Sequence, residues 1–142
     1  MRQRFDKVIR IVSLGVRRAY TLVLIDDGLY LIQTGSGGTL KHYRRDEQGA
    51  VVSTRPADRG VQALQAAEDQ IDTIALDEVV KAPGNYFIRL EAIEDVELKS
   101  RKHEPEMWIG VTGSEHHLFF PFATLDEVQP LQHALNKWLA LR

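Results

Sequence analysis

The sequence predicts an α+β fold that is mainly β, in which antiparallel strands are covered by one C-terminal amphipathic helix. Three observations support this prediction. Short runs rich in β-branched residues, separated by turn signals, occupy most of the chain. One interior segment, residues 56–82, instead carries apolar residues at helical spacing. The last segment begins with a helix-start motif and continues as an apolar helical stripe, which must pack on exposed sheet.

Length and composition are those of one folded domain, so we expect residues 1–142 to share a single core: 44% of the residues are hydrophobic and 27% are charged. The net charge of -2 gives no overall attraction to nucleic acid, which is therefore not an expected partner. No cysteine is present, which excludes disulfides and thiolate chemistry. Apolar runs are too short to cross a bilayer, and charged residues interrupt any secretory signal near the start. The sequence predicts a cytoplasmic protein with no transmembrane segment.

Three strands are expected in the first part of the chain. The first ends at Gly15, as a strand bounded by a turn should. Asp27 and Gly28 favour the positive φ angles of a tight turn, so they predict a hairpin between the second and third strands. The glycine-rich residues 34–39 should end the third strand, and residues 40–53 are predicted to be irregular or weakly extended. The three expected strands are residues 7–14, 19–25 and 29–33.

Residues 56–81 are predicted to be helical. Apolar residues recur there at intervals of three and four, and alanine, glutamine and glutamate fill many of the remaining positions. A break is expected near Asp72, because Asp72 or Thr73 can cap a second helix. Pro83 cannot continue that helix. The apolar face consists of Val61, Leu64, Ala67, Ile71 and Ile74.

Strand patterns return after this helical segment. Val96 and Leu98 alternate with charged residues, so one face of their strand should cover a core while the other contacts water. Residues 112–115 include Gly113 and predict another hairpin. The expected late strands are residues 86–90, 92–101, 107–111 and 116–122.

The C-terminal segment predicts an amphipathic helix. Thr124 and Glu127 have the spacing at which each side chain bonds the other residue's backbone amide. Pro130 removes a helical hydrogen bond at a cost of about 3 kcal/mol, so the helix either kinks there or becomes regular only near Gln129. We expect Trp138 to pack into the core. The apolar stripe is Leu125, Val128, Leu131, Leu135, Trp138 and Leu139.

The run DEVVKAPGNYFIRLEAIEDVELKS, residues 77–100, resembles a segment of bacterial pleckstrin-homology-like (PH-like) domains, although Arg89 stands where those domains usually have proline. The resemblance extends over residues 8–141. It implies an antiparallel barrel, or curved sheets, of about seven strands, capped at one end by the C-terminal helix. Residues 56–82 would then be a helical insertion. The positions that match are Asn85, Ile88, Leu90, Ile93, Val96 and Leu98.

The resemblance also implies a candidate anion site. Members that bind phosphoinositides hold the headgroup with basic residues on the first two strands and the loop between them. In this sequence Lys7 and Arg10 lie on the first expected strand, and Arg17 and Arg18 lie in the expected loop. Guanidinium groups match phosphate through paired hydrogen bonds. The alternative is that these arginines are solvated turn residues.

Other motifs give little support for catalysis or cofactors. The glycine-rich residues 35–38 lack the spacing of a P-loop, and whether they bind any ligand stays open. His116 and His117 are adjacent in a strand and should point to opposite faces, so they do not suit one metal ion. The sequence predicts no catalytic residue, no metal site and no cofactor.

The function we expect is therefore a non-catalytic PH-like binding module that binds a protein partner or self-associates. Open strand edges could pair with an extended peptide, and Trp108, with Met107 and Ile109 beside it, is the candidate interface. One alternative is binding of anionic lipid headgroups through the first inter-strand loop, with weak peripheral membrane contact. A second alternative is a small-ligand carrier or enzyme whose pocket lies between the helical insertion and the sheet.

Overall fold

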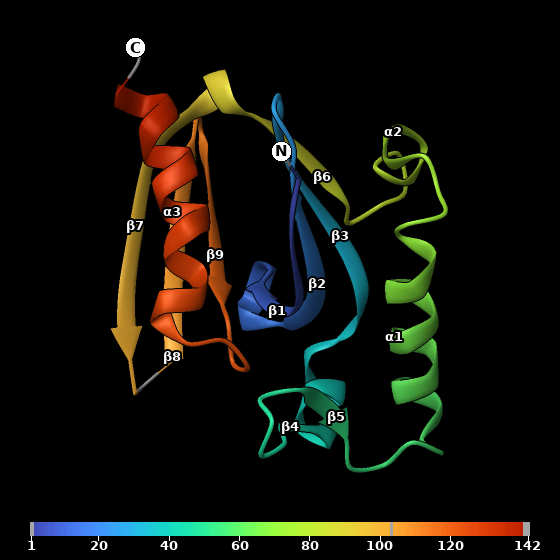
Figure 1. Cartoon of the computed structure of the whole chain (residues 1–142). Helices are drawn as coiled ribbons and strands as arrows, with labels where there is room; N and C mark the ends of the chain where they lie inside the picture. The colour runs from blue at the N-terminus through green and yellow to red at the C-terminus, as the bar shows by residue number, and fades with distance from the viewer. Residues whose placement is uncertain (1, 103, 141–142) are drawn as a thin grey trace.

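The computed structural model describes residues 2–102 and 104–140. Seven strands form one antiparallel sheet in the order β6-β3-β2-β1-β9-β8-β7, while β4 and β5 form a separate hairpin (Figure 1). The elements are β1 (Gln3–Ile11), η1 (Ser13–Gly15), β2 (Arg17–Leu24), β3 (Gly28–Ser36), η2 (Gly37–His42), β4 (Tyr43–Arg45), β5 (Val51–Ser53), α1 (Arg59–Gln70), α2 (Leu76–Val79), β6 (Tyr86–Arg89), η3 (Leu90–Ala92), β7 (Ile93–Arg101), β8 (Glu104–Val111), β9 (Ser114–Phe119) and α3 (Leu125–Ala140), where η marks a 3-10 helix.

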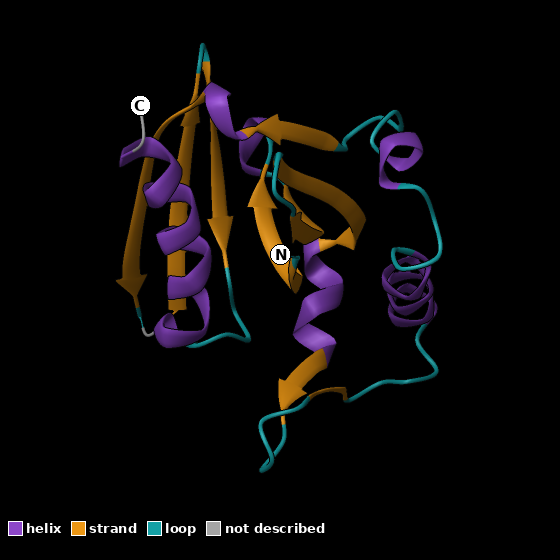
Figure 2. Cartoon of the chain, turned by 45° about the horizontal axis from the view of Figure 1, so that its top comes forward, coloured by secondary structure: helices purple, strands orange, loops and turns teal. Residues whose placement is uncertain are grey.

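The large sheet is curved but not closed. Leu22 of β2, Leu31 of β3 and Met107 of β8 belong to one buried cluster, so distant parts of the sheet turn the same face toward a common core. The edge strands are β6 and β7, which follow each other in the chain and are linked through η3 (Figure 2). The prediction of a mainly β fold with an antiparallel sheet and a C-terminal helix is confirmed. The closed-barrel form of that prediction is wrong, because no strand pairing among the described residues joins β6 to β7.

The helix α3 covers the part of the sheet formed by β7 and β8 (Figure 1). The Thr124 amide donates to Glu127 Oε1 at 2.9 Å, and the Glu127 amide donates to Thr124 Oγ1 at 3.3 Å, so the predicted start motif is confirmed. The helix begins at Leu125 and includes Pro130, so the alternative of a start near Gln129 is wrong. Its fully buried residues are Val128, Leu131 and Leu135.

Trp138 does not lie in the core, contrary to expectation. Its side chain is half-buried at the rim of two surface cavities, next to Ile25 and Asp26 at the end of β2. On the last turn of α3 it is Leu139, about 100° further round the helix, that faces the core, so Trp138 lies toward the rim. Leu139, one position further, keeps a partial contact with the core.

The helical insertion covers the opposite, outer face of the sheet (Figure 1). Val61 and Leu64 of α1 belong to a buried cluster that includes Ala19 of β2. Ile71, just after α1, belongs to a second cluster with Val23 of β2. The predicted break near Asp72 is confirmed, because α1 ends at Gln70 and α2 begins at Leu76. The sheet therefore has helices on both faces.

Several boundaries differ from those predicted. The first strand begins at Gln3 and ends at Ile11. The third strand continues through Gly35 to Ser36, because its outer face at this point packs on Leu64 of α1, whose side chain lies in contact distance of Gly35. Residues 40–53, predicted to be irregular or weakly extended, contain the short β4–β5 hairpin, so the extended alternative is confirmed. The predicted hairpin between β2 and β3 forms, with Leu24 opposite Leu29, but neither Asp27 nor Gly28 has the positive φ angle that was expected there.

A β-bulge in β1 sets the faces of the first strand. Phe5 lies opposite Leu22, and Val8 lies opposite Tyr20, so β1 uses one residue more than β2 over this interval. In a regular strand, residues three apart point to opposite faces, whereas the extra residue lets Phe5 and Val8 both contact the core. Lys7 takes the left-handed backbone conformation that this bulge requires, with φ of 56°.

The bulge directs the Lys7 side chain toward α1. Its ammonium lies 2.8 Å from Glu68 Oε1, and both side chains are buried. Burial raises the pKa of Glu68, and the Lys7 ammonium opposes that rise. Arg4 adds a hydrogen bond of 2.7 Å from Nη2 to the Glu68 carbonyl oxygen. The first strand thereby holds the helical insertion through a buried ion pair.

Loss of one partner of this ion pair should destabilise the protein. In a Glu68→Ala variant the Lys7 ammonium stays buried without its carboxylate, and we expect the free energy of unfolding to fall by about 3 kcal/mol. Urea unfolding followed by circular dichroism measures this change. The double variant Lys7→Met and Glu68→Leu replaces the pair with apolar side chains and should recover most of the loss. Equal losses in the single and double variants would contradict this account.

Candidate functional site

The structure brings Arg10 and Arg18 together, but not the whole set of four predicted anion-binding residues. Lys7 is bound to Glu68 on the outer face. The prediction that Arg17 and Arg18 lie in the first loop is wrong. Both belong to β2, which already begins at Arg17. Arg10 and Arg18 are direct partners in the β1–β2 register, so their side chains leave the same, inner face of the sheet.

Arg17 leaves the outer face instead. Its guanidinium carbon lies 5.5 Å from the centre of the Phe119 ring, as in a cation–π contact. The preceding loop contains Leu14, whose side chain is fully exposed, and Val16, which is 43% exposed. The tip of this loop is therefore apolar, and the arginines stand at its base.

Arg10 lies at the centre of a polar cluster on the inner face. Only 9% of the residue is exposed. Its Nε donates to His116 Nδ1 at 3.2 Å, and its Nη1 donates to Tyr20 Oη at 3.3 Å. Its guanidinium carbon lies 4.4 Å from the centre of the Tyr86 ring, so a cation–π contact adds to the two hydrogen bonds.

Tyr20 links this cluster to the segment that precedes β6. Its hydroxyl donates to the Gly84 carbonyl oxygen at 2.6 Å and accepts from Arg10. Burial raises the pKa of Tyr20, so the phenol stays protonated at neutral pH. Asn85 fixes the same segment, since its Oδ1 accepts from the Gln33 amide at 2.7 Å. Residues far apart in the sequence are thus held in a fixed arrangement around Arg10.

His116 is neutral at physiological pH. Burial, followed by the nearby charge of Arg10, lowers its pKa to about 4. Because Nδ1 accepts a hydrogen bond from Arg10, the ring proton must be on Nε2. His116 therefore presents an acceptor to Arg10 and a donor on its other side.

A groove of about 490 Å³ lies next to this cluster. On one side it is bounded by the edge strand β6, and on the other by residues at the β8–β9 hairpin. It therefore occupies part of the opening that separates the sheet edges. No carboxylate lines it, whereas two arginines do. The lining residues are Arg10, Tyr86, Phe87, Ile88, Arg89, Ala92, Val111, Ser114 and His116.

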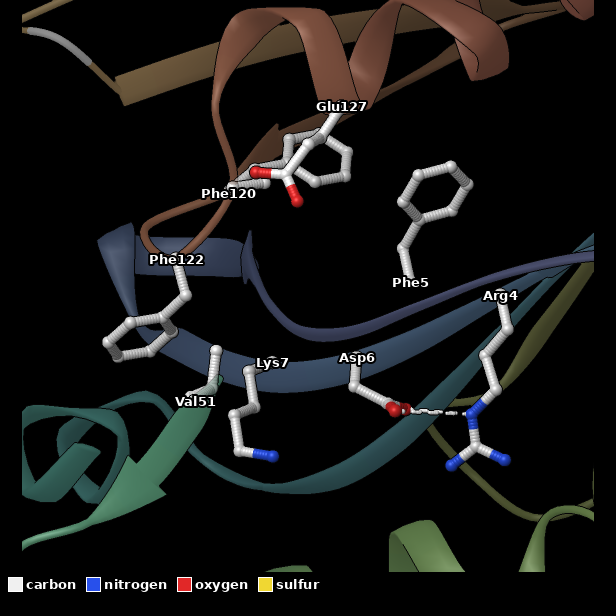
Figure 3. A pocket seen from close by; sticks show the side chains of 9 residues that line it. Arg4, Phe5, Asp6, Lys7, Val51, Phe120, Phe122 and Glu127 are labelled. Carbon is white, nitrogen blue, oxygen red and sulfur yellow. Dashed lines mark hydrogen bonds and ion pairs between the residues drawn. The ribbon is translucent and has the colours of Figure 1, made fainter. Parts of the chain in front are cut away.

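A second cavity, of about 570 Å³, lies between the β1 bulge and the start of α3. Figure 3 shows Phe5 and Phe122 on either side of it, with Asp6 and Lys7 between them. The charged side chains that line this cavity already form ion pairs, so they are less suited to binding a charged ligand than Arg10 is. The pairs are Arg4 with Asp6, Lys7 with Glu68, and Glu127 with Arg45.

The predicted interface residues lie on two different faces. Met107 and Ile109 are fully buried in the core and cannot form a surface, because β8 turns them toward α3. Trp108 is on the outer face and half-buried, and its ring stacks on that of His117 with 4.4 Å between ring centres. His117 and His116 point to opposite faces, as predicted.

Sequence reasoning missed Tyr20, His116 and Tyr86. Tyr20 and His116 read as ordinary strand residues, since nothing local shows that they meet Arg10. The sequence does contain one signal of this cluster, the alternation of side chains along a strand. Arg10 is two residues from the buried Val8 and shares its face, so its side chain enters the core region and needs polar neighbours there. Which residues supply them depends on strand order.

Within the described ranges, no three histidine, aspartate or glutamate side chains gather closely enough to hold a metal ion. Of the helices in those ranges, none has the length and apolar character needed to span a membrane. Comparison of the chain with family models, curated proteins and solved structures gave no match. The site must therefore be interpreted from its own geometry.

His116 should make stability depend on pH. Its pKa is about 4 in the folded protein against 6.5 ordinarily, so its contribution is complete above pH 6.5 and is lost as the pH falls toward 4. The free energy of unfolding should fall by up to about 1.4 kcal/mol per pH unit within this window.

The variant His116→Asn, whose side-chain oxygen can accept from Arg10, should flatten this pH dependence in urea titrations. His133→Asn is the matched control, because His133 is exposed on α3 and should leave the profile unchanged. If the His116 variant follows the parent profile, His116 is not the group that titrates.

Proposed function

We propose that this protein is a binding domain for another protein, and that it takes an extended segment of its partner along the edge of β6. The observation that carries this proposal is the position of the groove. All the residues of β6, from Tyr86 to Arg89, line it. A strand edge presents backbone donors and acceptors in the spacing that a further strand needs.

The side chains around this edge favour the same function. Tyr86 is 39% exposed, and Phe87 and Ile88 follow it in the groove lining. Partly exposed aromatic side chains are common at the centres of protein interfaces, since they bury a large area with few rotatable bonds. β6 is short, so side-chain contacts must add to the few backbone hydrogen bonds that it can make.

The other sheet edge is less suited to a partner. Charged side chains of β7 include Glu97 and Lys99, which form an ion pair of 3.0 Å across the exposed face. Charged side chains on an edge strand discourage pairing with other chains. The two edges thus differ in chemistry, and the apolar one lies beside the groove.

Selection of binding peptides tests this function. Random linear peptides displayed on phage are panned against the full chain, and the enriched peptides are synthesised for calorimetry. We expect Tyr86→Ala to weaken them by roughly tenfold, because an aromatic anchor is lost. Ile74→Ala is the matched control, since Ile74 is equally exposed, at 39%, but lies beyond α1.

Backbone pairing is tested separately in the same complexes. N-methylation of the peptide at alternate positions should abolish binding, and amide hydrogen exchange at residues 86–89 should slow when the peptide is bound. Equal binding by methylated and unmethylated peptides would contradict edge pairing and overturn the proposal.

A second candidate function is contact with an anionic membrane surface. It is favoured by the loop that joins β1 and β2, which carries the exposed Leu14 and is followed by Arg17 and Arg18 at the start of β2. An apolar tip with basic residues at its base suits the boundary between lipid headgroups and acyl chains.

Charge reversal at the base of the loop should weaken membrane binding. Replacing Arg17 and Arg18 with glutamate should reduce co-sedimentation with vesicles of anionic phospholipid by at least about tenfold. The matched control is the pair Arg55→Glu and Arg59→Glu, which changes the charge equally at exposed positions at and just before the start of α1. Co-sedimentation that is unchanged in the Arg17 and Arg18 variant would eliminate this candidate.

A further inference from the structure

Resting on the proposed function, we infer that the bound segment carries an acidic residue whose carboxylate binds Arg10. The groove along β6 then has two parts. The strand edge binds the backbone of the segment, and Arg10 selects one side chain by its charge.

The first step of this inference is the missing counter-charge. Arg10 carries a cationic guanidinium, and the residue is only 9% exposed. No ion pair of the described residues includes Arg10, and its hydrogen bonds are to the neutral side chains of His116 and Tyr20. A buried charge without an opposite charge is costly, so a carboxylate brought by a ligand should be bound strongly.

The second step is the geometry of the donors that remain. The hydrogen bonds to His116 and Tyr20 use Nε and Nη1, so Nη2 keeps its donors for a ligand. His116 adds no donor on the Arg10 side, because its Nδ1 accepts from Arg10 and its Nε2 proton points away from the guanidinium. Arg10 and His116 both line the groove. A carboxylate in the groove can therefore accept from Nη2 in a charge-assisted hydrogen bond.

The third step is the arginine opposite. Arg18 faces Arg10 across the β1–β2 pair, and like charges at directly opposite positions destabilise a sheet. The described residues place no carboxylate within ion-pair distance of Arg18 either. Arg89 also lines the groove, but it is paired with Glu91 at 3.2 Å. An acidic group at Arg10 would relieve the repulsion between two arginines.

The occupant that we infer is an aspartate or glutamate side chain of a partner segment. Arg10 is reached from a groove whose remaining wall is the edge and the aromatic residues of β6, and these suit a polypeptide. A phosphate-bearing membrane is the competing source of negative charge, and the experiment below separates the two.

The test compares acid and amide forms of the same peptide. Peptides enriched against the full chain should share aspartate or glutamate at one position, and replacing that residue with asparagine or glutamine should weaken binding by at least about tenfold. Arg10→Gln should remove this difference between acid and amide peptides. Arg89→Gln should preserve it, because Arg89 lines the same groove but already has a partner.

A second measurement covers the case in which Arg10→Gln does not fold. The Arg10→Lys variant keeps the positive charge but loses the planar set of guanidinium donors. It should bind the acid peptide less tightly than the parent does, while still preferring the acid peptide to the amide peptide. In the parent protein, the Nε signal of Arg10 in a nitrogen-15 spectrum should shift with the acid peptide and not with the amide peptide.

Each outcome has one meaning. If peptides bind in a manner that depends on Tyr86, but acid and amide forms bind equally, the inference is wrong and the proposed function stands. If no peptide is enriched, the proposed function fails, and the inference fails with it. If vesicles of anionic phospholipid bind through Arg10 and shift its Nε signal while acid peptides do not, the site belongs to a membrane surface and the inference is overturned.

Discussion

The bulge in β1 is the constraint on which the rest of the structure depends. One extra residue at this point lets Phe5 and Val8 both contact the core, although their spacing would otherwise place them on opposite faces. The same bulge sends Lys7 outward to Glu68 on α1. A single irregularity therefore fixes the inner face of the first strand and the position of the helical insertion. Without it, either Phe5 or Val8 would leave the core, and α1 would lose its buried ionic contact with the sheet.

The consequence for the inner face appears two residues after Val8. Because Val8 points into the core, Arg10 must point the same way, although a guanidinium is unsuited to an apolar interior. The fold meets this difficulty at the part of the sheet that α3 does not cover. There Tyr20 and His116 supply neutral acceptors, and the Tyr86 ring covers the guanidinium. The hydrogen bond from Tyr20 to Gly84 connects the cluster to β6, so the charged site and the sheet edge are held by the same contacts.

Sequence patterns predicted where most helices and strands lie, but they did not predict which face of a strand points into the core. Thr124 and Glu127 predicted the start of α3 because a capping box depends only on neighbouring residues. The break near Asp72 and the hairpin at Gly28 could also be predicted, because they too depend on residues close in the sequence. Alternation could not tell the inner from the outer face of β1, since helices cover the outer side and Ile9 packs there. Arg10 was identified as a site residue, but its neighbours come from strands that are distant in the sequence, and no spacing rule joins them.

The division of the sheet into a covered and an uncovered part is the reason why we place the proposed binding site beside β6. α3 fills the space against β7 and β8, and the insertion covers the outer face of β2 and β3. Most of the apolar surface is thereby used in folding and is not accessible to a partner. The opening beside β6 differs, because closing it would bury Arg10 completely and without a counter-charge. The strand edge of β6 and the cation of Arg10 thus lie together at one groove.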